Sequence, residues 1–394
     1  MDPTQPPRIR LVGVGKTYPG GTVAVHALDL EVTRGEVLTL VGPSGCGKST
    51  TLKMINRLVE PTTGSIELDG EDVTHMNAVH LRRRIGYVIQ QVGLFPHQTV
   101  RDNVATLPRL LGWPRVRTRA RVDELLTMVD LDPAALGDRY PHQLSGGQQQ
   151  RVGVARALAA DPEVLLMDEP FGAVDPIVRS RLQEMFLELQ EQLATTVVFV
   201  THDIEEAVRL GDRVAVFAPG GHLAQVDTPA RVLGQPADDF VAEFVGADRG
   251  LRRLAVTPID MLDLEQPPVV HADDSLKQAA AAMSAAHARW AVVIDRDERL
   301  RGWVGARRAA ARDGKVRDGA RRMDAWVDQT ASLKDALAAM LQWDAGWVAV
   351  LDGDHFLGVL TPSTLHEALR RSVEADVRGV DPAQVTVGSA GPLH

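Results

Sequence analysis

Residues 36–50 read EVLTLVGPSGCGKST, an apolar run followed by a glycine-rich loop that ends in Lys-Ser-Thr. The apolar run is continuous, which is typical of a strand whose sheet is covered on both faces. The loop matches the spacing G-x-x-x-x-G-K-[ST], a motif that requires a strand before it and a helix after it. A purely structural glycine-rich turn is the alternative. The lysine and serine at its end favour a site for nucleotide phosphates.

The residues of this loop suit a nucleotide in detail. The glycines allow backbone N–H groups to close around phosphate oxygens, Lys48 reaches the β and γ oxygens, and the Ser49 hydroxyl binds Mg²⁺. Cys46 exposes the site to alkylation, although a small residue that fits a crowded loop is the simpler interpretation. We therefore predict ATP and Mg²⁺ as ligands. The predicted binding residues are Gly42, Pro43, Ser44, Gly45, Cys46, Gly47, Lys48, Ser49 and Thr50.

A second apolar strand, EVLLMDE at residues 163–169, ends in two carboxylates. Ligands of open α/β sheets bind at the carboxyl ends of strands. We therefore expect Asp168 to hold Mg²⁺, directly or through water, and Glu169 to orient and deprotonate an attacking water. The alternative is an acidic pair that caps the next helix. With a third strand at residues 195–203, the alternation of strands and helices up to about Val245 predicts a parallel sheet with crossover helices.

The composition limits the class of protein. A chain of 394 residues is too long for one ordinary core, and its 44% hydrophobic and 24% charged residues are typical of a soluble globular protein. No apolar run approaches the roughly 18 residues that cross a bilayer. The net charge of -9 argues against general nucleic-acid binding, and the single cysteine excludes an internal disulfide. We expect a cytoplasmic location.

The last third of the chain contains an internal repeat. SLKQAAAAM at residues 275–283 and SLKDALAAM at residues 332–340 are offset by 57 residues, and the offset continues through Trp290 and Trp347. Each copy predicts an amphipathic helix, a strand, an acidic turn and a strand that begins near a glycine. One copy has too little apolar surface to stand alone, so we expect the two copies to pack together. The predicted inward helix positions are Leu276, Ala280 and Met283, and Leu333, Leu337 and Met340.

The order of the short motifs resembles the ATP-binding subunit of an ABC transporter. After the phosphate loop come YVIQQ with Gln90, HQLSGGQQQR at residues 142–151, the strand at 163–169, GAVD with Asp175 and THD with His202. The resemblance covers the predicted first domain. It implies the fold class α/β, with a P-loop NTPase (ABC ATPase) core and an inserted helical subdomain.

The resemblance also implies roles for single residues. Tyr18 would stack on adenine, Gln90 would sense Mg²⁺ and a transmembrane partner, and His202 would contact the γ-phosphate. Taken alone, Tyr18 and His202 are better explained as a core aromatic and a structural histidine, and it is their place in this series of motifs that favours the functional roles. LSGGQ would lie across a head-to-tail dimer on the γ-phosphate of ATP held by a second copy. The implied sets are catalytic Glu169, His202 and Gln90; metal-binding Ser49, Gln90 and Asp168; and, in trans, Ser145, Gly146, Gly147, Gln148 and Asp175.

A finer resemblance is to importers of glycine betaine, proline, choline and related quaternary amines. It rests on residues 88–113, in which GLFPHQTV would meet the coupling helix of the membrane subunit. The repeat is similar to a tandem of CBS domains, an α+β appendage of such ATPase subunits. The implied substrates are glycine betaine, choline, carnitine or proline. The implied partners are permease subunits and, indirectly, a substrate-binding protein, at the cytoplasmic face of the membrane.

These resemblances give the expected domain limits. We expect a flexible tail at 1–7, an ABC ATPase domain at 8–248 with its helical subdomain at about 91–160, CBS domains at 249–313 and 314–374, and a loose tail at 375–394. The CBS pair is interpreted as a regulatory module. A protein-docking module without a sensory role is the alternative.

The repeat departs from nucleotide-binding CBS domains, in which the second strand leads to an aspartate that holds ribose. Arg308 and Thr364 stand at those positions, so an adenosine ligand held in this way is not expected. Residues 289–322 contain 11 basic and 5 acidic residues. They are either a solvated surface or a surface for salt-screened contact with anionic lipid.

Two other functions stay open for the whole chain. One is an importer ATPase for another amino acid or a polyamine. The other is a soluble ABC-type ATPase that acts on DNA or the ribosome, but such proteins usually carry long coiled coils, zinc-binding cysteines or two ATPase halves. One half, one cysteine and no long heptad run argue against the second function.

Overall fold

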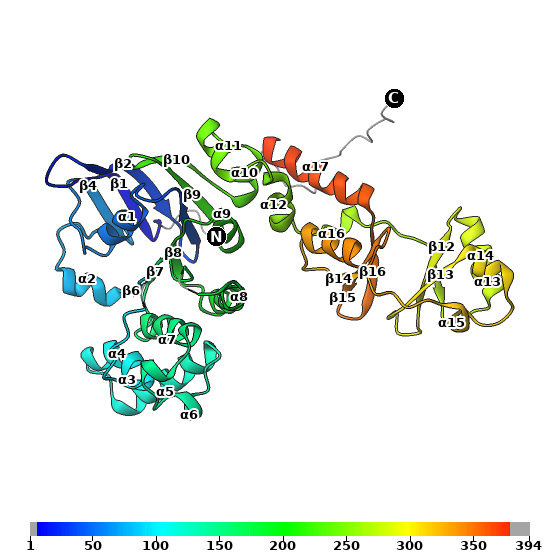
Figure 1. The fold of residues 1–394 in the computed structure, drawn as a ribbon, viewed down its shortest axis with the longest axis horizontal. Coiled ribbons are helices and arrows are strands. Elements are labelled where there is room, and N and C mark those ends of the chain that lie inside the picture. The colour runs from blue at the N-terminus through cyan, green and yellow to red at the C-terminus, as the bar shows by residue number, and fades with distance from the viewer. Residues whose placement is uncertain (1–5, 91, 173, 379–394) are drawn as a thin grey trace. The chain divides into compact units, whose positions relative to one another are not determined.

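The computed structural model describes residues 6–90, 92–172 and 174–378 (Figure 1). They form two compact units: unit 1 contains residues up to 232 and 236–246, and unit 2 contains residues 233–235 and those from 247 onward. Most of the predicted tail at 1–7 and the part of the predicted tail after residue 378 lie outside the described residues. Residues 375–378 belong to the last helix.

The centre of unit 1 is a six-stranded sheet with the order β10-β9-β3-β8-β7-β6. Its strands pair in parallel except for β10, which pairs antiparallel with β9. Every residue of β3, β7 and β8 is buried, because separate apolar clusters cover the two faces of the sheet. The predicted continuous apolar strands are confirmed. The strands are β3 (Val37–Val41), β6 (Ile85–Val88), β7 (Val164–Asp168), β8 (Thr196–Val200), β9 (Arg213–Ala218) and β10 (His222–Asp227).

On one face, helix α1 (Lys48–Ile55) packs together with a second, antiparallel sheet of order β2-β1-β4-β5. Residues of both sheets and of α1 share a single apolar cluster, which fixes the start of α1 at the carboxyl end of β3. The second sheet consists of β1 (Ile9–Thr17), β2 (Val23–Val32), β4 (Thr63–Leu68) and β5 (Glu71–Asp72), and α2 (Ala78–Arg84) follows it.

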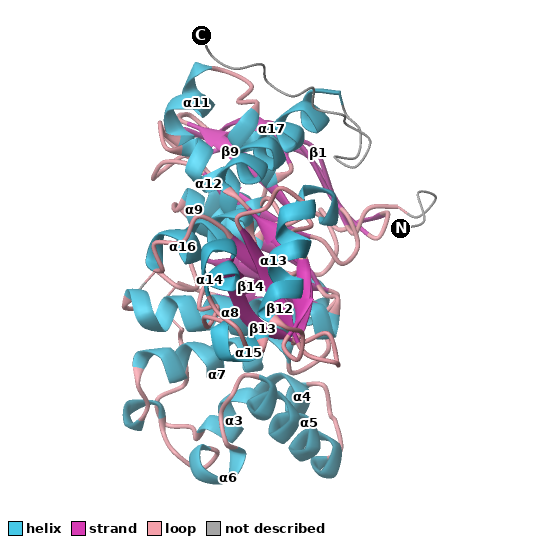
Figure 2. Cartoon of the chain, turned by 90° about the vertical axis from the view of Figure 1, so that its right-hand side faces the viewer, coloured by secondary structure: helices cyan, strands magenta, loops and turns pink. Residues whose placement is uncertain are grey.

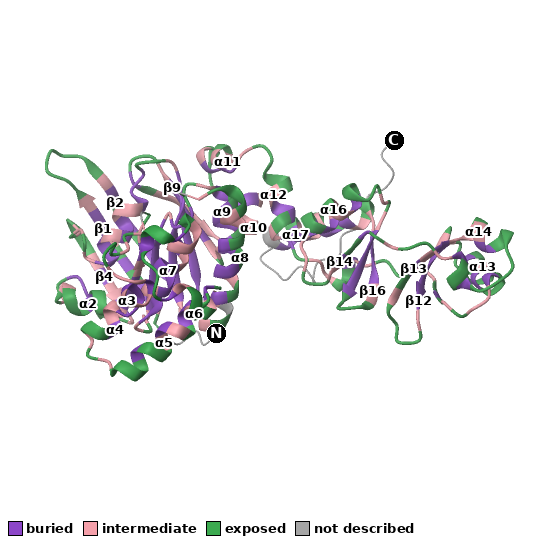
Figure 3. Cartoon of the chain, turned by 60° about the horizontal axis from the view of Figure 1, so that its bottom comes forward, coloured by how far each residue is buried: buried purple, intermediate pink, exposed green. Residues whose placement is uncertain are grey.

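The chain between β6 and β7 is helical, as predicted. Its apolar side chains form one cluster with the other face of the central sheet. Figure 3 colours the buried positions of these helices and strands purple. The helices of this insertion are α3 (Val100–Val104), α4 (Thr106–Leu110), α5 (Arg115–Met128), α6 (Pro133–Leu136), the 3₁₀ turn η1 (Pro141–Gln143) and α7 (Gly146–Leu158). The remaining helices are α8 (Pro176–Leu193), α9 (Ile204–Leu210), α10 (Pro229–Gly234, which crosses from unit 1 into unit 2) and α11 (Asp239–Val245).

Unit 2 shows the repeat as two copies of a three-stranded sheet, of orders β11-β12-β13 and β14-β15-β16. Figure 2 labels three of these strands, β12, β13 and β14, in magenta. In each copy the first pair is parallel and the second antiparallel. The strands are β11 (Val269–His271), β12 (Trp290–Ile294), β13 (Leu300–Gly305), β14 (Trp326–Asp328), β15 (Val348–Asp352) and β16 (His355–Leu360). The helices are α12 (Arg249–Val256), η2 (Met261–Asp263), α13 (Leu276–Ala285), α14 (Ala306–Ala311), α15 (Val316–Gly319), α16 (Leu333–Gln342) and α17 (Pro362–Arg378).

The inward faces of α13 and α16 differ by one position from the prediction. The fully buried alanines are Ala279 and Ala336, whereas Ala280 and Leu337 are half-buried at the edge of the apolar stripe. Positions i+3 and i+4 of a helix lie on opposite flanks of the same stripe, so sequence spacing alone does not decide which is central.

The two copies contact each other through Trp290 and Trp347. Their rings are stacked with centroids 4.0 Å apart and planes 3° apart. Val292, Ile294 and Val359 form the buried cluster against which both rings pack. The 57-residue offset therefore places equivalent residues face to face, as expected if the two copies pack together.

Replacing either Trp290 or Trp347 with alanine is expected to lower the free energy of unfolding of unit 2 by about 2 kcal/mol, because each change exposes apolar surface. The double variant should lose about 1 kcal/mol less than the sum, because stacked rings stabilise each other. Denaturant unfolding of the four proteins measures this coupling. Trp343→Ala, a half-exposed tryptophan of α16's C-terminal end, is the control. Strictly additive losses would contradict the stack.

No helix among the described residues is both long enough and apolar enough to cross a bilayer.

Candidate active site

The phosphate loop connects the end of β3 to the first residue of α1. Gly42, Gly45 and Gly47 have φ angles of 152°, 80° and 96°, a region that L side chains rarely adopt. A Cβ at Gly42 or Gly47 would lie 2.3 Å from a backbone oxygen, that of Phe217 or Ala24. At Gly45 the space is open. The backbone of this loop therefore takes conformations that favour glycine at three positions, as expected of a loop whose N–H groups bind phosphate.

Lys48 lies beneath this loop and is only 5% exposed. Its Nζ donates hydrogen bonds to the carbonyl oxygens of Gly42 at 2.7 Å and Pro43 at 3.0 Å. None of the ion pairs among the described residues involves Lys48. A buried ammonium whose hydrogen-bond acceptors are all uncharged is poorly compensated, so it favours an anion in the loop. Cys46 is buried beside Lys48, with its sulfur 3.5 Å from Nζ, which agrees with a small residue in a crowded loop.

Ser49 and Asp168 lie side by side. The Ser49 hydroxyl donates to Oδ1 of Asp168 at 2.8 Å, and Asp168 is 8% exposed. A hydroxyl and a carboxylate at the mouth of a phosphate loop are the oxygen donors that Mg²⁺ prefers, so these residues fit the predicted metal. Burial and the nearby Asp168 carboxylate raise the pKa of the Tyr87 hydroxyl, which keeps it a proton donor beside that carboxylate. No sequence pattern used above singles out Tyr87.

Glu169 contacts both of the other predicted catalytic side chains. Nε2 of Gln90 donates to its Oε2 at 3.1 Å, and Nδ1 of His202 lies 3.3 Å from the same oxygen. Glu169 has a φ of 46°, so the backbone turns sharply directly after β7. The acidic pair does not cap the next helix, because the N-cap of α8 is Asp175, which accepts from the N–H groups of Ile177 and Val178.

Tyr18 lies in the turn between β1 and β2 and is 37% exposed. The turn is closed by a hydrogen bond from the Tyr18 N–H to the Thr22 carbonyl, and Lys16 Nζ lies 5.3 Å from the ring centroid. The Ala24 oxygen lies next to Gly47, so the start of β2 borders the phosphate loop. The ring is thus accessible near that loop.

Helix α7 begins with the two glycines of LSGGQ, Gly146 and Gly147. Ser145 is the N-cap; its hydroxyl accepts from the Gln148 N–H, and Oε1 of Gln148 accepts from the Ser145 N–H. The side chain of Gln148 is therefore used by the cap. A Cβ at Gly146 would meet nothing within 4 Å, so this helix start is open. The first N–H groups of a helix have no partners within it, and they bind anions well.

Another buried acid lies beside the site but outside the predicted set. Glu206 of α9 accepts a hydrogen bond from Nε2 of Gln183 in α8 at 3.0 Å, and burial raises its pKa. It connects the helix that follows His202 to the helix that follows Asp175. A charged residue at an otherwise apolar position of IEEAVRL was the available signal in the sequence.

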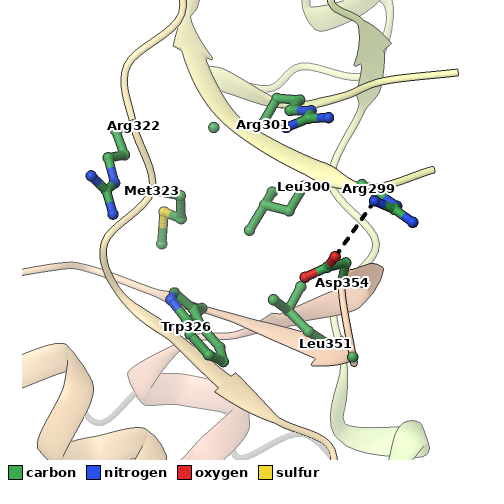
Figure 4. Close-up of a pocket in the computed structure, with 10 residues that line it drawn as sticks. Arg299, Leu300, Arg301, Arg322, Met323, Trp326, Leu351 and Asp354 are labelled. Atoms are coloured by element: carbon green, nitrogen blue, oxygen red, sulfur yellow. Dashed lines mark ion pairs between the residues drawn. The ribbon is translucent and has the colours of Figure 1, made fainter. Parts of the chain in front are cut away.

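Unit 2 contains a cavity of about 430 Å³ between the two repeat copies (Figure 4). Arg299, Arg301 and Arg322 line it together with Leu300, Met323, Trp326 and Leu351. Arg299 and Arg301 pair with Asp354 and Asp295, and Arg322 pairs with Asp324. The basic segment is thus partly neutralised by carboxylates. Thr364 bonds locally to Thr361, at the position where an aspartate was missing.

Comparison with protein families identifies two matches. The model of the ABC transporter family matches residues 25–172, and that of the CBS domain matches residues 260–311. The chain is 44% identical to the glycine betaine/carnitine/choline transport ATP-binding protein OpuCA of Bacillus subtilis, over 93% of this chain and 98% of the relative. It is 46% identical to the osmoprotectant import ATP-binding protein OsmV of Salmonella typhimurium, over 84% and 87% of the two chains.

Solved structures match more than half of the chain. A dimeric ATP-binding cassette in a post-hydrolysis state, bound to ADP and Pi, has 36% identity and a TM-score of 0.51 and covers 56% of this chain and 98% of its own. A second structure, cbiO1 of Clostridium perfringens, part of the ABC transporter complex cbiONQ, has 29% identity and a TM-score of 0.55 over 59% and 93% of the two chains. These matches confirm the resemblance that the motif order implied.

Proposed function

The chain belongs to the family of ABC transporter ATP-binding proteins, and on that premise we propose that it hydrolyses ATP to drive uptake of a quaternary-amine osmoprotectant. The observation that supports the ATPase activity best is the convergence of Gln90, Glu169 and His202 beside the Ser49–Asp168 pair. The substrate class rests on the relatives, whose names refer to glycine betaine, carnitine, choline and osmoprotectants.

The residues divide the reaction between charge and positioning. Lys48 and the loop N–H groups hold the β- and γ-phosphates. Mg²⁺, held by Ser49 and Asp168, would neutralise charge on the phosphate oxygens. Glu169 accepts the proton of the attacking water, and His202 and Gln90 hold that carboxylate and the γ-phosphate in place.

We propose that two copies assemble head to tail around two ATP molecules. The start of α7 would bind the γ-phosphate held by the other copy, through the N–H groups of Gly146 and Gly147 and the hydroxyl of Ser145. Two observations support this. The helix start is open, and a similar cassette forms a dimer. Gln148 contributes by fixing the cap rather than through a free side chain.

The permease subunits would dock on the helical insertion from the membrane side, with the chain at the cytoplasmic face and the substrate-binding protein contacted only indirectly. A cavity of about 820 Å³ lies between α3 and α5 of this insertion, next to the predicted contact segment GLFPHQTV. Arg115 and Arg119 line it, and the described ion pairs include neither residue. An acidic side chain of the permease fits this cavity by charge.

We propose that unit 2 regulates transport, as a CBS pair that responds to anions or ionic strength. The arginines around the cavity of Figure 4 support this role, because their contacts with an anionic group or an anionic lipid surface would be screened by salt. The stacked rings of Trp290 and Trp347 join the two repeat copies, so the copies could respond together.

Reconstitution with the membrane partner tests the proposal. Uptake of betaine, choline, carnitine and proline would be compared across ionic strengths, and at least one of the four should be transported with ATP consumption. If none drives uptake or ATPase activity, the osmoprotectant function is wrong. The regulatory role predicts that the double variant Arg301→Glu and Arg322→Glu shifts the salt dependence, whereas Arg307→Glu, outside the cavity, does not. An unchanged salt dependence contradicts it.

A further inference from the structure

Helix α7 contacts its own active site at positions that recur every third residue. Gly147, Gln150, Gly153 and Arg156 form this row. Gly147 contacts α8, where its Cβ would lie 2.6 Å from Cγ1 of Val178. The other three residues contact the two backbone segments that carry Gln90 and Glu169.

Arg156 holds the segment that follows Gln90. Its guanidinium donates to the carbonyl oxygens of Val92 and Gly93, each at 2.8 Å, and lies 6.0 Å from the Phe95 ring centroid. No ion pair among the described residues involves Arg156, and burial lowers its pKa. A partly buried guanidinium without a carboxylate is unfavourable for folding alone. Its contacts are all to this one loop.

Gly153 lets the same loop approach closely. A Cβ at this position would lie 2.6 Å from Cγ1 of Val92, so only glycine admits the valine side chain against the helix. Glycine in a helix interior costs about 1 kcal/mol relative to alanine. The helix therefore gives up intrinsic stability for this contact.

Gln150 holds the segment that follows Glu169. It is 3% exposed, and its Nε2 donates to the carbonyl oxygen of Pro170, the next residue after Glu169. Gln90 and Glu169 are themselves bonded to each other. One helix thus fixes both sides of that hydrogen bond.

We propose that Arg156 is a positioning residue: with Gly153 and Gln150 it makes helix α7, Gln90 and Glu169 one mechanical unit. A γ-phosphate from the second copy at the start of α7 then sets the geometry of this copy's own hydrolytic site. The inference rests on the proposed head-to-tail dimer, because it requires a ligand at the start of α7. Each of the two active sites thereby responds to occupancy of the other.

The first test is Arg156→Ala in the full chain. ATP binding, measured with a fluorescent nucleotide, should stay within about twofold of wild type, because the phosphate loop is untouched, while kcat falls about tenfold through misplacement of Gln90 and Glu169. Arg156→Lys should recover part of the loss, since an ammonium replaces one contact but cannot form the fork. Arg151→Ala is the matched control: it is on α7 and binds the carbonyls of Val129 and Asp130.

A second test does not depend on the folding of the arginine variant. Gly153→Ala should push Val92 away and lower kcat, and adding Val92→Ala should restore part of the activity by removing the clash. The proposal is overturned if Arg156→Ala keeps wild-type kcat, if Arg151→Ala loses as much, or if Val92→Ala gives no recovery. Failure of the wild-type chain to dimerise with ATP would instead contradict the proposed function.

Discussion

Glu169→Gln is expected to lower kcat by about 1,000-fold, because the amide cannot accept the proton of the attacking water. ATP binding should be kept, since Gln preserves the size of the side chain and can still bond to Gln90 and His202. The hydrolysis that separates the two copies is then lost, so an ATP-bound dimer should accumulate. Size-exclusion chromatography with light scattering, with and without ATP, measures the dimer. A variant that hydrolyses ATP at the wild-type rate would contradict the role of Glu169.

The Glu169→Gln variant also tests whether the start of α7 binds the ATP that the partner copy holds. Adding Ser145→Arg fills the open start of α7 and should abolish the ATP-dependent dimer while leaving ATP binding to the monomer intact. Loss of the N-cap alone costs about 1 kcal/mol, so a control must share that cost. Ser275→Arg does so, because Ser275 caps α13 in unit 2 with the same reciprocal bonds to a glutamine, Gln278. A stable dimer with Ser145→Arg would mean that the start of α7 does not bind the partner's ATP.

The sequence predicts the core of this fold because the local signals and the packing agree. The strands at 36–42 and 163–169 are mainly apolar, without the alternation of a half-exposed strand, and in the structure both faces of β3 and β7 are covered. The repeat could be found because its offset of 57 residues is kept from Ser275 to Asp352. The most deeply buried position of α13 and α16 could not be predicted. Ala279 and Ala280 are equivalent by helical spacing, and only the neighbouring sheet decides which of them is buried.

The candidate site was predicted residue by residue, but its supports were not. The side chains that we propose to bind ATP occur in short motifs with fixed spacing, such as Lys48 with Ser49. Tyr87 and Arg156 act through residues that are distant in the sequence, so no local pattern indicates them, whereas Glu206 is indicated only by a charge at an apolar position of its helix. Gly153 is instructive: as a glycine within a helix it contradicts helix propensity, and its reason becomes visible only with Val92 beside it.

Lys48→Ala is expected to weaken ATP binding by about 1,000-fold, or about 4 kcal/mol, because Nζ would form two charge-assisted bonds to the β and γ oxygens. Folded stability should change little: the variant loses the bonds to the Gly42 and Pro43 carbonyls, but it also removes a buried charge whose desolvation opposes folding. Lys53→Ala, in the last turn of the same helix, controls for helix effects and should bind ATP normally.

The Lys48→Ala experiment distinguishes a structural role of Lys48 in the loop from a role in phosphate binding. If the ammonium mainly supports the loop, the alanine variant should unfold at lower temperature and lose affinity only in proportion to that instability. If the ammonium mainly binds phosphate, the affinity for ATP falls while the midpoint of unfolding stays near that of wild type. The structure favours the second outcome, because carbonyl oxygens only partly compensate an ammonium that is 5% exposed. Wild-type ATP affinity in Lys48→Ala would show that the loop N–H groups alone bind the nucleotide.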